Sequence, residues 1–252
     1  EFAAEQLRTI GLRPGKRTTL QCFTEVVFSD TTQKNKRPDG LIVISTGVQK
    51  KYFLVESKIG NAELNAGQIE SYLRICKEKK LDGVITISNQ YSTAPSIHPL
   101  EEVRKFKIKV PVYHWSWMSL LTTIDRMVSN EDVGDIDQRL LMNELRRFLS
   151  HDSTGVKGFD RMPPEWAEVN NTLSNKGSIT ARSDHAQKVV DAWTQEAKDL
   201  CLILSRLTNT SVREKLPTTH ATNPDARKKA SIKELVGKQI LSAKFEIPGA
   251  AS

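Results

Sequence analysis

Cysteine is scarce in this sequence of 252 residues, and the cysteines stand far apart. Cys22, Cys76 and Cys201 form no Cys-x-x-Cys pair, and their number is odd. A disulfide framework, a structural zinc site and a four-cysteine iron–sulfur cluster all require paired or closely spaced cysteines. The sequence therefore argues against all three, and a reducing cytoplasm is the expected location.

Long apolar runs are also missing. No segment approaches the roughly 18 consecutive apolar residues of a membrane helix, so we expect no membrane partner. The first residues, EFAAEQLRTIGLRPGKR, lack the apolar core and cleavage site of a secretory signal. The sequence has no initiator Met and stops at KFEIPGAAS, just after a strand-like run. We expect a piece of a longer protein, incomplete at its C-terminal end.

Acidic residues are outnumbered by basic ones. Lys and Arg total 37 against 30 Asp and Glu, which gives a formal net charge of +7. A basic surface favours a polyanionic partner such as nucleic acid. The excess is a weak signal by itself, because many basic proteins bind no nucleic acid.

Hydrophobic periodicity predicts an α/β fold for residues 1–150. The pattern indicates a helix at 2–10, a strand (alternatively a helix) at 18–28, and a hairpin of strands 40–45 and 52–59. The predicted elements that follow are a helix within 62–80, strands at 82–89 and 106–115, and helices at 116–128 and 135–149. Because a helical crossover precedes the strand at 82–89, we expect a mixed, partly antiparallel sheet flanked by helices.

Beyond Gly155 the composition shifts towards long polar helices. We predict a second, mainly helical region at 151–252, whose longest helix covers 183–209 and begins at Ser183 or Asp184. This helix is expected to pack on the core or on a second subunit rather than on DNA, which leaves a homodimer open.

Charged residues interrupt the apolar hairpin, in the stretch RPDGLIVISTGVQKKYFLVESKIG. Glu56 and Lys58 project from one face of their strand because side chains alternate, and Asp39 can lie across from them. Two carboxylates offer hard oxygen ligands for Mg²⁺ and leave room for water and substrate phosphates. Lys58 beside them can orient or deprotonate an attacking water.

The next helix adds two polar residues on one face. Gln68 and Tyr72 are four residues apart, so both can lean over the hairpin end. Gln68 can hydrogen-bond a metal-bound water or a phosphate, and Tyr72 can contact a phosphate or stack on a base.

These motifs together, RPDG, VESK and GQIESY, resemble the PD-(D/E)xK nuclease superfamily. The Gln-x-x-x-Tyr element is similar to the RecB-like branch, and TEVVF, DGVITISN and YHWSW resemble a group of uncharacterised bacterial members. The resemblance covers about residues 15 to 117 and implies a restriction-endonuclease-like core. The sequence lacks the upstream catalytic histidine motif of the RecB-like pattern, so processive exonuclease action is not implied.

The resemblance also implies roles for individual residues. Asp39 and Glu56 would bind Mg²⁺ with the main-chain carbonyl of Ser57, and Mn²⁺ would substitute. Lys58 would position the water, and Gln68 would support the site. Glu25 corresponds to the upstream acid that some members add as a further metal ligand.

Several of these residues have ordinary structural alternatives. Tyr72 lies on the apolar helix face and is equally well explained as a core residue. Glu25 is better explained as a surface strand residue than as a ligand. His98 and His114 lack ligand spacing, so we expect a loop histidine and a hydrogen-bonded histidine near the sheet edge.

A basic segment, QKNKR, leads directly into the RPDG motif. Its position suggests that Lys34, Lys36 and Arg37 contact nucleic-acid phosphates, although a solvated surface explains them equally well.

The sequence therefore predicts a cytoplasmic, metal-dependent nuclease that hydrolyses phosphodiester bonds of DNA, in DNA repair or in defence against foreign DNA. RNA is not excluded as a substrate. The alternative is a catalytically inactive module that keeps the nuclease fold and binds nucleic acid or regulates a partner.

Overall fold

The computed structural model describes residues 1–28, 32–33, 36–47 and 49–249. The chain divides into two compact units, Glu1–Lys157 and Gly158–Ser252, whereas the amino-acid sequence predicts a boundary at residue 150. The N-terminal unit contains the elements α1 (Phe2–Thr9), β1 (Thr18–Thr24), β2 (Gly40–Thr46), β3 (Gln49–Ser57), α2 (Ala66–Lys79), β4 (Gly83–Ser88), α3 (Glu101–Arg104), β5 (Val112–Ser116), α4 (Trp117–Ser129), α5 (Ile136–Leu149) and the 3-10 helix η1 (Asp152–Thr154).

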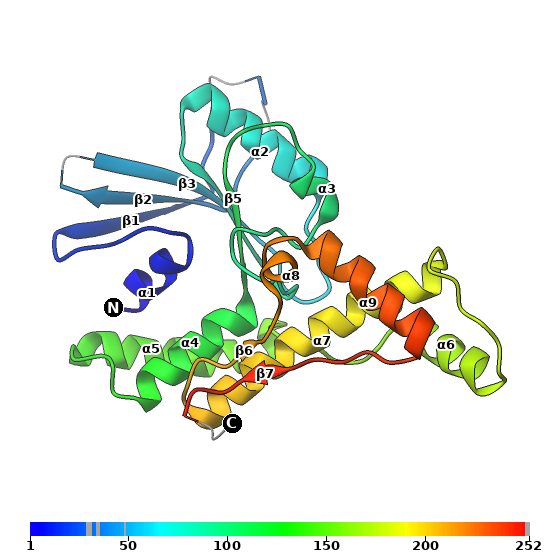
Figure 1. Ribbon diagram of the computed structural model, residues 1–252. Helices are drawn as coiled ribbons and strands as arrows, with labels where there is room; N and C mark the ends of the chain where they lie inside the picture. The colour runs from blue at the N-terminus through cyan, green and yellow to red at the C-terminus, as the bar shows by residue number, and fades with distance from the viewer. Residues whose placement is uncertain (29–31, 34–35, 48, 250–252) are drawn as a thin grey trace. The chain divides into compact units, whose positions relative to one another are not determined.

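A five-stranded mixed sheet in the order β1-β2-β3-β4-β5 forms the centre of this unit (Figure 1). The pairs β1–β2 and β2–β3 are antiparallel, and only two residues separate β2 from β3, as in a hairpin. The pairs β3–β4 and β4–β5 are parallel, and α2 makes the crossover between β3 and β4. The expected mixed sheet with a helical crossover is therefore confirmed.

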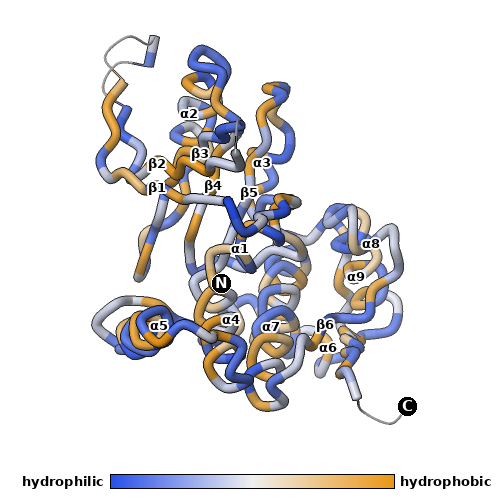
Figure 2. Tube along the Cα trace, turned by 90° about the vertical axis from the view of Figure 1, so that its left-hand side faces the viewer, coloured by the Kyte–Doolittle hydropathy of each residue, from blue (hydrophilic) through white to orange (hydrophobic). Residues whose placement is uncertain are grey.

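The two faces of the sheet carry separate hydrophobic cores. Leu54 and Val84 pack under α2 with Ile69 and Leu73. On the other face, Phe53, Ile85 and Trp115 pack against residues of α1 and α4. Alternation along each strand explains the division, since neighbouring residues point to opposite faces. The stretches of β2, β3 and β4 that form these cores are accordingly hydrophobic (Figure 2).

Two strands are shorter than the sequence predicts. β1 ends at Thr24 rather than at residue 28, since Glu25 has a φ of +50°, which an extended strand does not permit. β5 begins at Val112 rather than at residue 106, directly after Pro111, whose ring nitrogen cannot donate a ladder hydrogen bond. β5 lies at an edge of the sheet, as its proline suggests.

The C-terminal unit is mainly helical, as expected. It contains α6 (Glu165–Ser174), α7 (Asp184–Thr208), β6 (Arg213–Glu214), α8 (Thr218–Thr222), α9 (Pro224–Lys238) and β7 (Phe245–Glu246). Val169, Val189, Val190, Ile232 and Leu235 form its core, where α6, α7 and α9 meet. Across the described residues, no helix is long and apolar enough to cross a membrane.

Candidate active site

Asp39 is held at the entrance of β2 by the end of β3. Its Oδ2 accepts hydrogen bonds from the Ser57 backbone N–H at 2.7 Å and from the Ser57 hydroxyl at 3.1 Å. Gly40 follows because a Cβ there would lie 3.0 Å from the carbonyl oxygen of Phe23 on β1. The close approach of the strands therefore explains glycine at position 40, and Asp39 itself is exposed.

Glu56 is buried, with 1% of its surface exposed. Its Oε1 forms an ion pair with the Lys58 ammonium, and its Oε2 accepts a hydrogen bond from the Tyr72 hydroxyl at 2.9 Å. A buried carboxylate is costly unless it is paired and hydrogen-bonded, and here each oxygen has a partner. The structure thus brings together Glu56 and Lys58, as the alternation of the strand predicts.

Tyr72 is fully buried, so it cannot stack on a base, and the core alternative holds. Its oxygen accepts a hydrogen bond from Gln68 Nε2 at 2.8 Å, and its single proton can go to Glu56 or to the Arg37 carbonyl, also at 2.9 Å. Burial and the negative charge of Glu56 raise the pKa of Tyr72, which keeps the phenol protonated. Tyr72 therefore orients the Glu56 carboxylate, and Gln68 acts on the site through Tyr72.

Two residues that sequence reasoning missed fix the backbone around this cluster. Trp117 is the first residue of α4, and its indole N–H donates a hydrogen bond to the Lys58 carbonyl at 2.8 Å. The Asn65 side chain accepts from the Gln68 backbone N–H at 2.9 Å and caps α2. The Asn65 cap could have been recognised from its position before a helical run, whereas the Trp117 contact is purely tertiary.

A row of polar side chains extends from Glu56 across the sheet. Thr86 pairs in register with Glu56 on one side and with His114 on the other, so the three share a face. The Thr86 hydroxyl oxygen lies 2.9 Å from His114 Nδ1 and 3.1 Å from His98 Nε2. All four residues are buried.

The hydrogen bonds of the two histidines fix their tautomers. His98 Nδ1 accepts from the Leu100 backbone N–H, so Nε2 carries the proton. His114 Nε2 donates to the Gln90 carbonyl, so Nδ1 is unprotonated and can accept the single proton of the Thr86 hydroxyl, for which the Tyr113 carbonyl at 3.1 Å is the other acceptor. Burial lowers the pKa of His98 to about 3 and that of His114 to about 4. Both rings are therefore neutral structural groups, in a loop and in the edge strand as expected.

The carboxylate oxygens of the candidate site are ligands of the kind that a hard divalent cation prefers, but they are few. Asp39 and Glu56 supply carboxylates of the type that Mg²⁺ prefers, and water and substrate would complete its shell. Within the residues that the structure describes, no three His, Cys, Asp or Glu side chains gather closely enough to hold a metal. Glu25 lies beside Asp39, because its backbone N–H donates to the Asp39 carbonyl at 3.0 Å, but its exposed side chain forms no three-ligand group with Asp39 and Glu56 among these residues.

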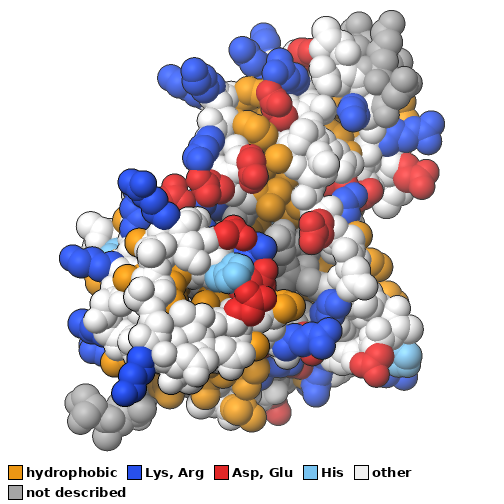
Figure 3. Space-filling view, turned by 90° about the vertical axis from the view of Figure 1, so that its right-hand side faces the viewer, with side chains coloured by type: hydrophobic (Ala, Val, Ile, Leu, Met, Phe, Trp, Pro, Cys, Tyr) orange, Lys and Arg blue, Asp and Glu red, His pale blue; other side chains and the backbone are white. Residues whose placement is uncertain are grey.

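The basic approach to the site is only partly described. Lys36 and Arg37 are exposed just before Asp39, while Lys34 lies outside the described residues. On the face drawn in Figure 3, Lys and Arg side chains are spread over the surface rather than gathered in one stripe.

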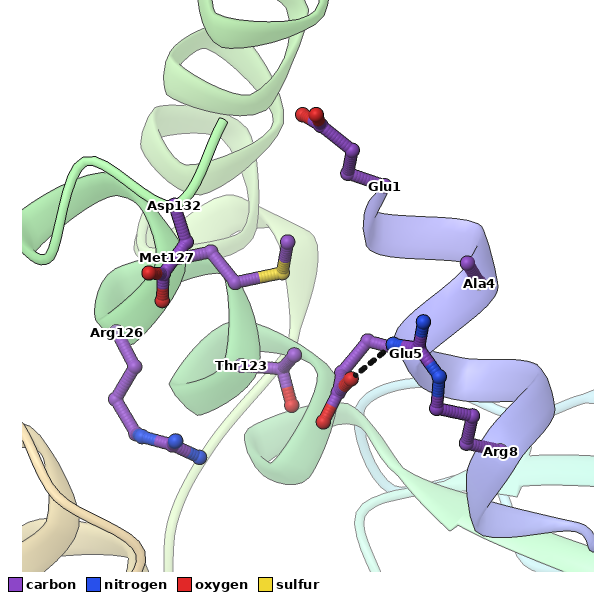
Figure 4. Close-up of a pocket in the computed structure, with 8 residues that line it drawn as sticks. All are labelled: Glu1, Ala4, Glu5, Arg8, Thr123, Arg126, Met127 and Asp132. Atoms are coloured by element: carbon purple, nitrogen blue, oxygen red, sulfur yellow. Dashed lines mark hydrogen bonds and ion pairs between the residues drawn. The ribbon is translucent and has the colours of Figure 1, made fainter. Parts of the chain in front are cut away.

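A separate hollow of about 370 Å³ lies between α1 and α4 and contains none of these residues. Figure 4 shows Arg8 and Glu5 from α1 hydrogen-bonded to each other at 2.8 Å, facing Thr123 and Arg126 of α4. These helices cover the face of the sheet opposite to Glu56, so this hollow is not part of the candidate active site.

Comparison with known proteins gives no relative: no family model, curated protein or solved structure matches the chain. The functional argument therefore depends on the geometry of the site.

Proposed function

We propose that this protein is a Mg²⁺-dependent nuclease that hydrolyses DNA phosphodiester bonds at the Asp39–Glu56–Lys58 cluster. The observation that carries the proposal is the buried, fully partnered Glu56 beside Lys58, at the strand end that also binds Asp39. A chain that needed only a stable sheet would place an apolar residue there. The order of the β2–β3 hairpin, α2 and parallel β4 also supports a restriction-endonuclease-like core.

Each residue has a role that its contacts support. Asp39 is exposed at the end of the sheet, where its second oxygen can reach a metal or a metal-bound water. Lys58, with 24% of its side chain exposed, is positioned between Glu56 and solvent and can orient an attacking water. Tyr72 and Gln68 hold the Glu56 carboxylate in one orientation. Mg²⁺, when bound, would polarise the phosphoryl oxygen and stabilise the leaving group.

The test is cleavage of single- and double-stranded DNA with Mg²⁺ or Mn²⁺, beside the variants Lys58→Ala and Asp39→Ala. Each variant should lose about 100-fold or more of the activity, the loss typical of removing a group that stabilises the transition state. Lys50→Ala, which removes an exposed lysine near the start of β3, is the matched control and should cut normally. Equal cleavage by wild type and both site variants would identify a contaminant and overturn the proposal. The same assay with RNA as the substrate determines whether the enzyme prefers DNA or RNA.

A second candidate is an inactive module that binds nucleic acid. It is favoured by the protein partners on both Glu56 oxygens and by the lack of a three-ligand metal group in the described chain. DNA binding that weakens with salt, without metal-dependent turnover on any substrate, would establish this function instead.

A further inference from the structure

The C-terminal unit contains a hollow of about 920 Å³ between α9 and the β6–β7 ribbon. Small residues create the space: Ala230, Ser231 and Gly237 line it from α9, and Ser242 and Ala243 face them. A Cβ placed on Gly237 would meet no atom within 4 Å. The volume is at the upper end of the range for small-molecule sites, so a nucleotide-sized ligand fits.

The hollow is lined by an excess of positive charge. Its cationic side chains belong to Lys215, Arg227, Lys233, Lys238 and Lys244, and its only carboxylates to Glu214 and Glu234. Glu214 is engaged in a buried ion pair with Arg227, and Glu234 lies 3.9 Å from Lys238. Lys215, Lys233 and Lys244 are exposed, and their ammonium groups have no hydrogen bond or ion pair within the described chain.

Lys215 and Lys244 stand directly opposite each other on the ribbon. β6 pairs with β7 through Glu214 and Phe245, and the Lys215 backbone N–H donates to the Lys244 carbonyl at 2.7 Å. Like charges at directly opposed strand positions repel each other and destabilise the pair. No carboxylate of the described chain forms an ion pair with either lysine, and a bound anion would reduce the repulsion.

The base of the hollow is rigid. The Arg227–Glu214 ion pair joins α9 to the ribbon, and both side chains are at least nine-tenths buried. Asn223 caps α9 by accepting from the Ala226 backbone N–H at 3.0 Å. The site therefore exists before any ligand arrives, which lowers the entropic cost of binding.

The remaining wall is apolar and partly aromatic. Trp193 from α7 lines the hollow together with Leu216 and Pro217. An indole surface can stack on a planar ring, and the lysines stand at the rim where phosphates would lie. A ligand with one flat ring and one or more phosphates matches both parts of the lining.

We propose that this hollow binds nucleotides, with the phosphates on Lys215 and Lys244 and the base against Trp193. The nucleotide is either a free nucleoside phosphate or a unit of a nucleic-acid strand. The site goes beyond the proposed nuclease and does not depend on it, because every residue belongs to the C-terminal unit.

The experiment measures equilibrium binding of ADP and of a short fluorescent single-stranded oligonucleotide to the full chain. EDTA is present, and the Lys58→Ala background prevents cleavage. Lys215→Gln and Lys244→Gln should each weaken binding about tenfold, the loss expected for one charge-assisted contact. Gly237→Leu should also weaken it by filling the open space. Lys229→Gln removes the same charge from an exposed position on α9 outside the hollow and should change the dissociation constant less than about twofold.

The two probes identify the source of the nucleotide. ADP binding that the hollow variants lose assigns a free nucleoside phosphate, and oligonucleotide binding alone, lost in the same variants, assigns a strand. The proposal is overturned if wild type binds neither probe, or if Lys229→Gln weakens binding as much as Lys215→Gln. Because binding is measured without metal, loss of cleavage in the Lys58 variant leaves this result unaffected.

Discussion

In the N-terminal unit the carboxylate of Glu56 is buried, and both of its oxygens have partners. In the C-terminal unit the ammonium groups of Lys215 and Lys244 belong to exposed residues and have no partner within the described chain. Burying a charge costs free energy, and the cost is offset only when the surrounding groups are fixed in place. Solvated charges carry no such cost and remain available to a ligand. The first arrangement suits a reaction that needs fixed geometry, and the second suits recognition of an anion.

Glu56→Ala should have the largest effect. Cleavage should fall about 1,000-fold or more, because Lys58 and Tyr72 lose the group that fixes them. The free energy of unfolding should also fall by about 2 kcal/mol, since the Tyr72 hydroxyl loses a buried partner while Lys58 can turn to solvent. DNA cleavage assays and urea unfolding measure the two effects.

The matched control for this variant is Glu70→Ala on α2. Within the described chain, the side chain of Glu70 makes an exposed ion pair with Arg74 and no other, so its loss should change stability by less than about 0.5 kcal/mol. If the Glu56→Ala and Glu70→Ala variants proved equally stable and active, Glu56 would contribute no more to stability or cleavage than an exposed glutamate does.

The polar row beside Glu56 predicts a dependence of stability on pH. His98 and His114 have pKa values of about 3 and about 4 in the folded protein, below the ordinary value of 6.5. Between about pH 4 and pH 6.5 the histidines of the unfolded chain bind protons that those of the folded protein do not. The stabilising contribution of the two neutral histidines is therefore present above about pH 6.5 and is lost as the pH falls. From pH 7 to pH 5 the loss should be roughly 2 kcal/mol for each histidine.

Unfolding in urea at pH 5, 6 and 7 measures this loss. His98→Gln and His114→Gln should each remove about half of the slope of unfolding free energy against pH, even where the variant is less stable overall. A slope that neither variant alters would show that other groups titrate in this range.

The surroundings of Glu56 separate the features that local sequence patterns predict from those that depend on tertiary packing. The alternation along β3 predicts that Glu56 and Lys58 lie together, and the helical spacing of apolar residues predicts α2, because both are local patterns. The sequence explains Tyr72 equally well as a core residue and as a nucleic-acid contact, and only its burial in the folded protein decides for the core. The Thr86 row and the Trp117 contact depend on strand register and on the placement of α4. The nuclease function and the metal remain predictions from local motifs.

Tyr72→Phe should have an intermediate effect. The ring keeps its packing, but Glu56 loses the hydroxyl that orients it, so we expect a loss of about 1–2 kcal/mol in stability and about tenfold in cleavage. Tyr113→Phe is the matched control, because the Tyr113 hydroxyl has no hydrogen bond within the described chain and its ring packs on Phe53. Similar activity for the two variants would mean that Tyr72 serves only as core.

The smallest effect should come from adding one methyl group to a helical glycine in each unit. Gly237→Ala on α9 meets open space at a negative φ, so it should raise stability by about 0.5 kcal/mol through helix propensity alone. Gly67→Ala on α2 places its methyl 3.3 Å from Asn65 Oδ1, the oxygen that caps the helix leading to Gln68 and Tyr72. At Gly67 this close contact should cancel the gain in helix propensity. Thermal unfolding should therefore show a higher melting temperature for Gly237→Ala than for Gly67→Ala. A larger gain at Gly67 than at Gly237 would contradict the picture of a closely fitted site in one unit and an open one in the other.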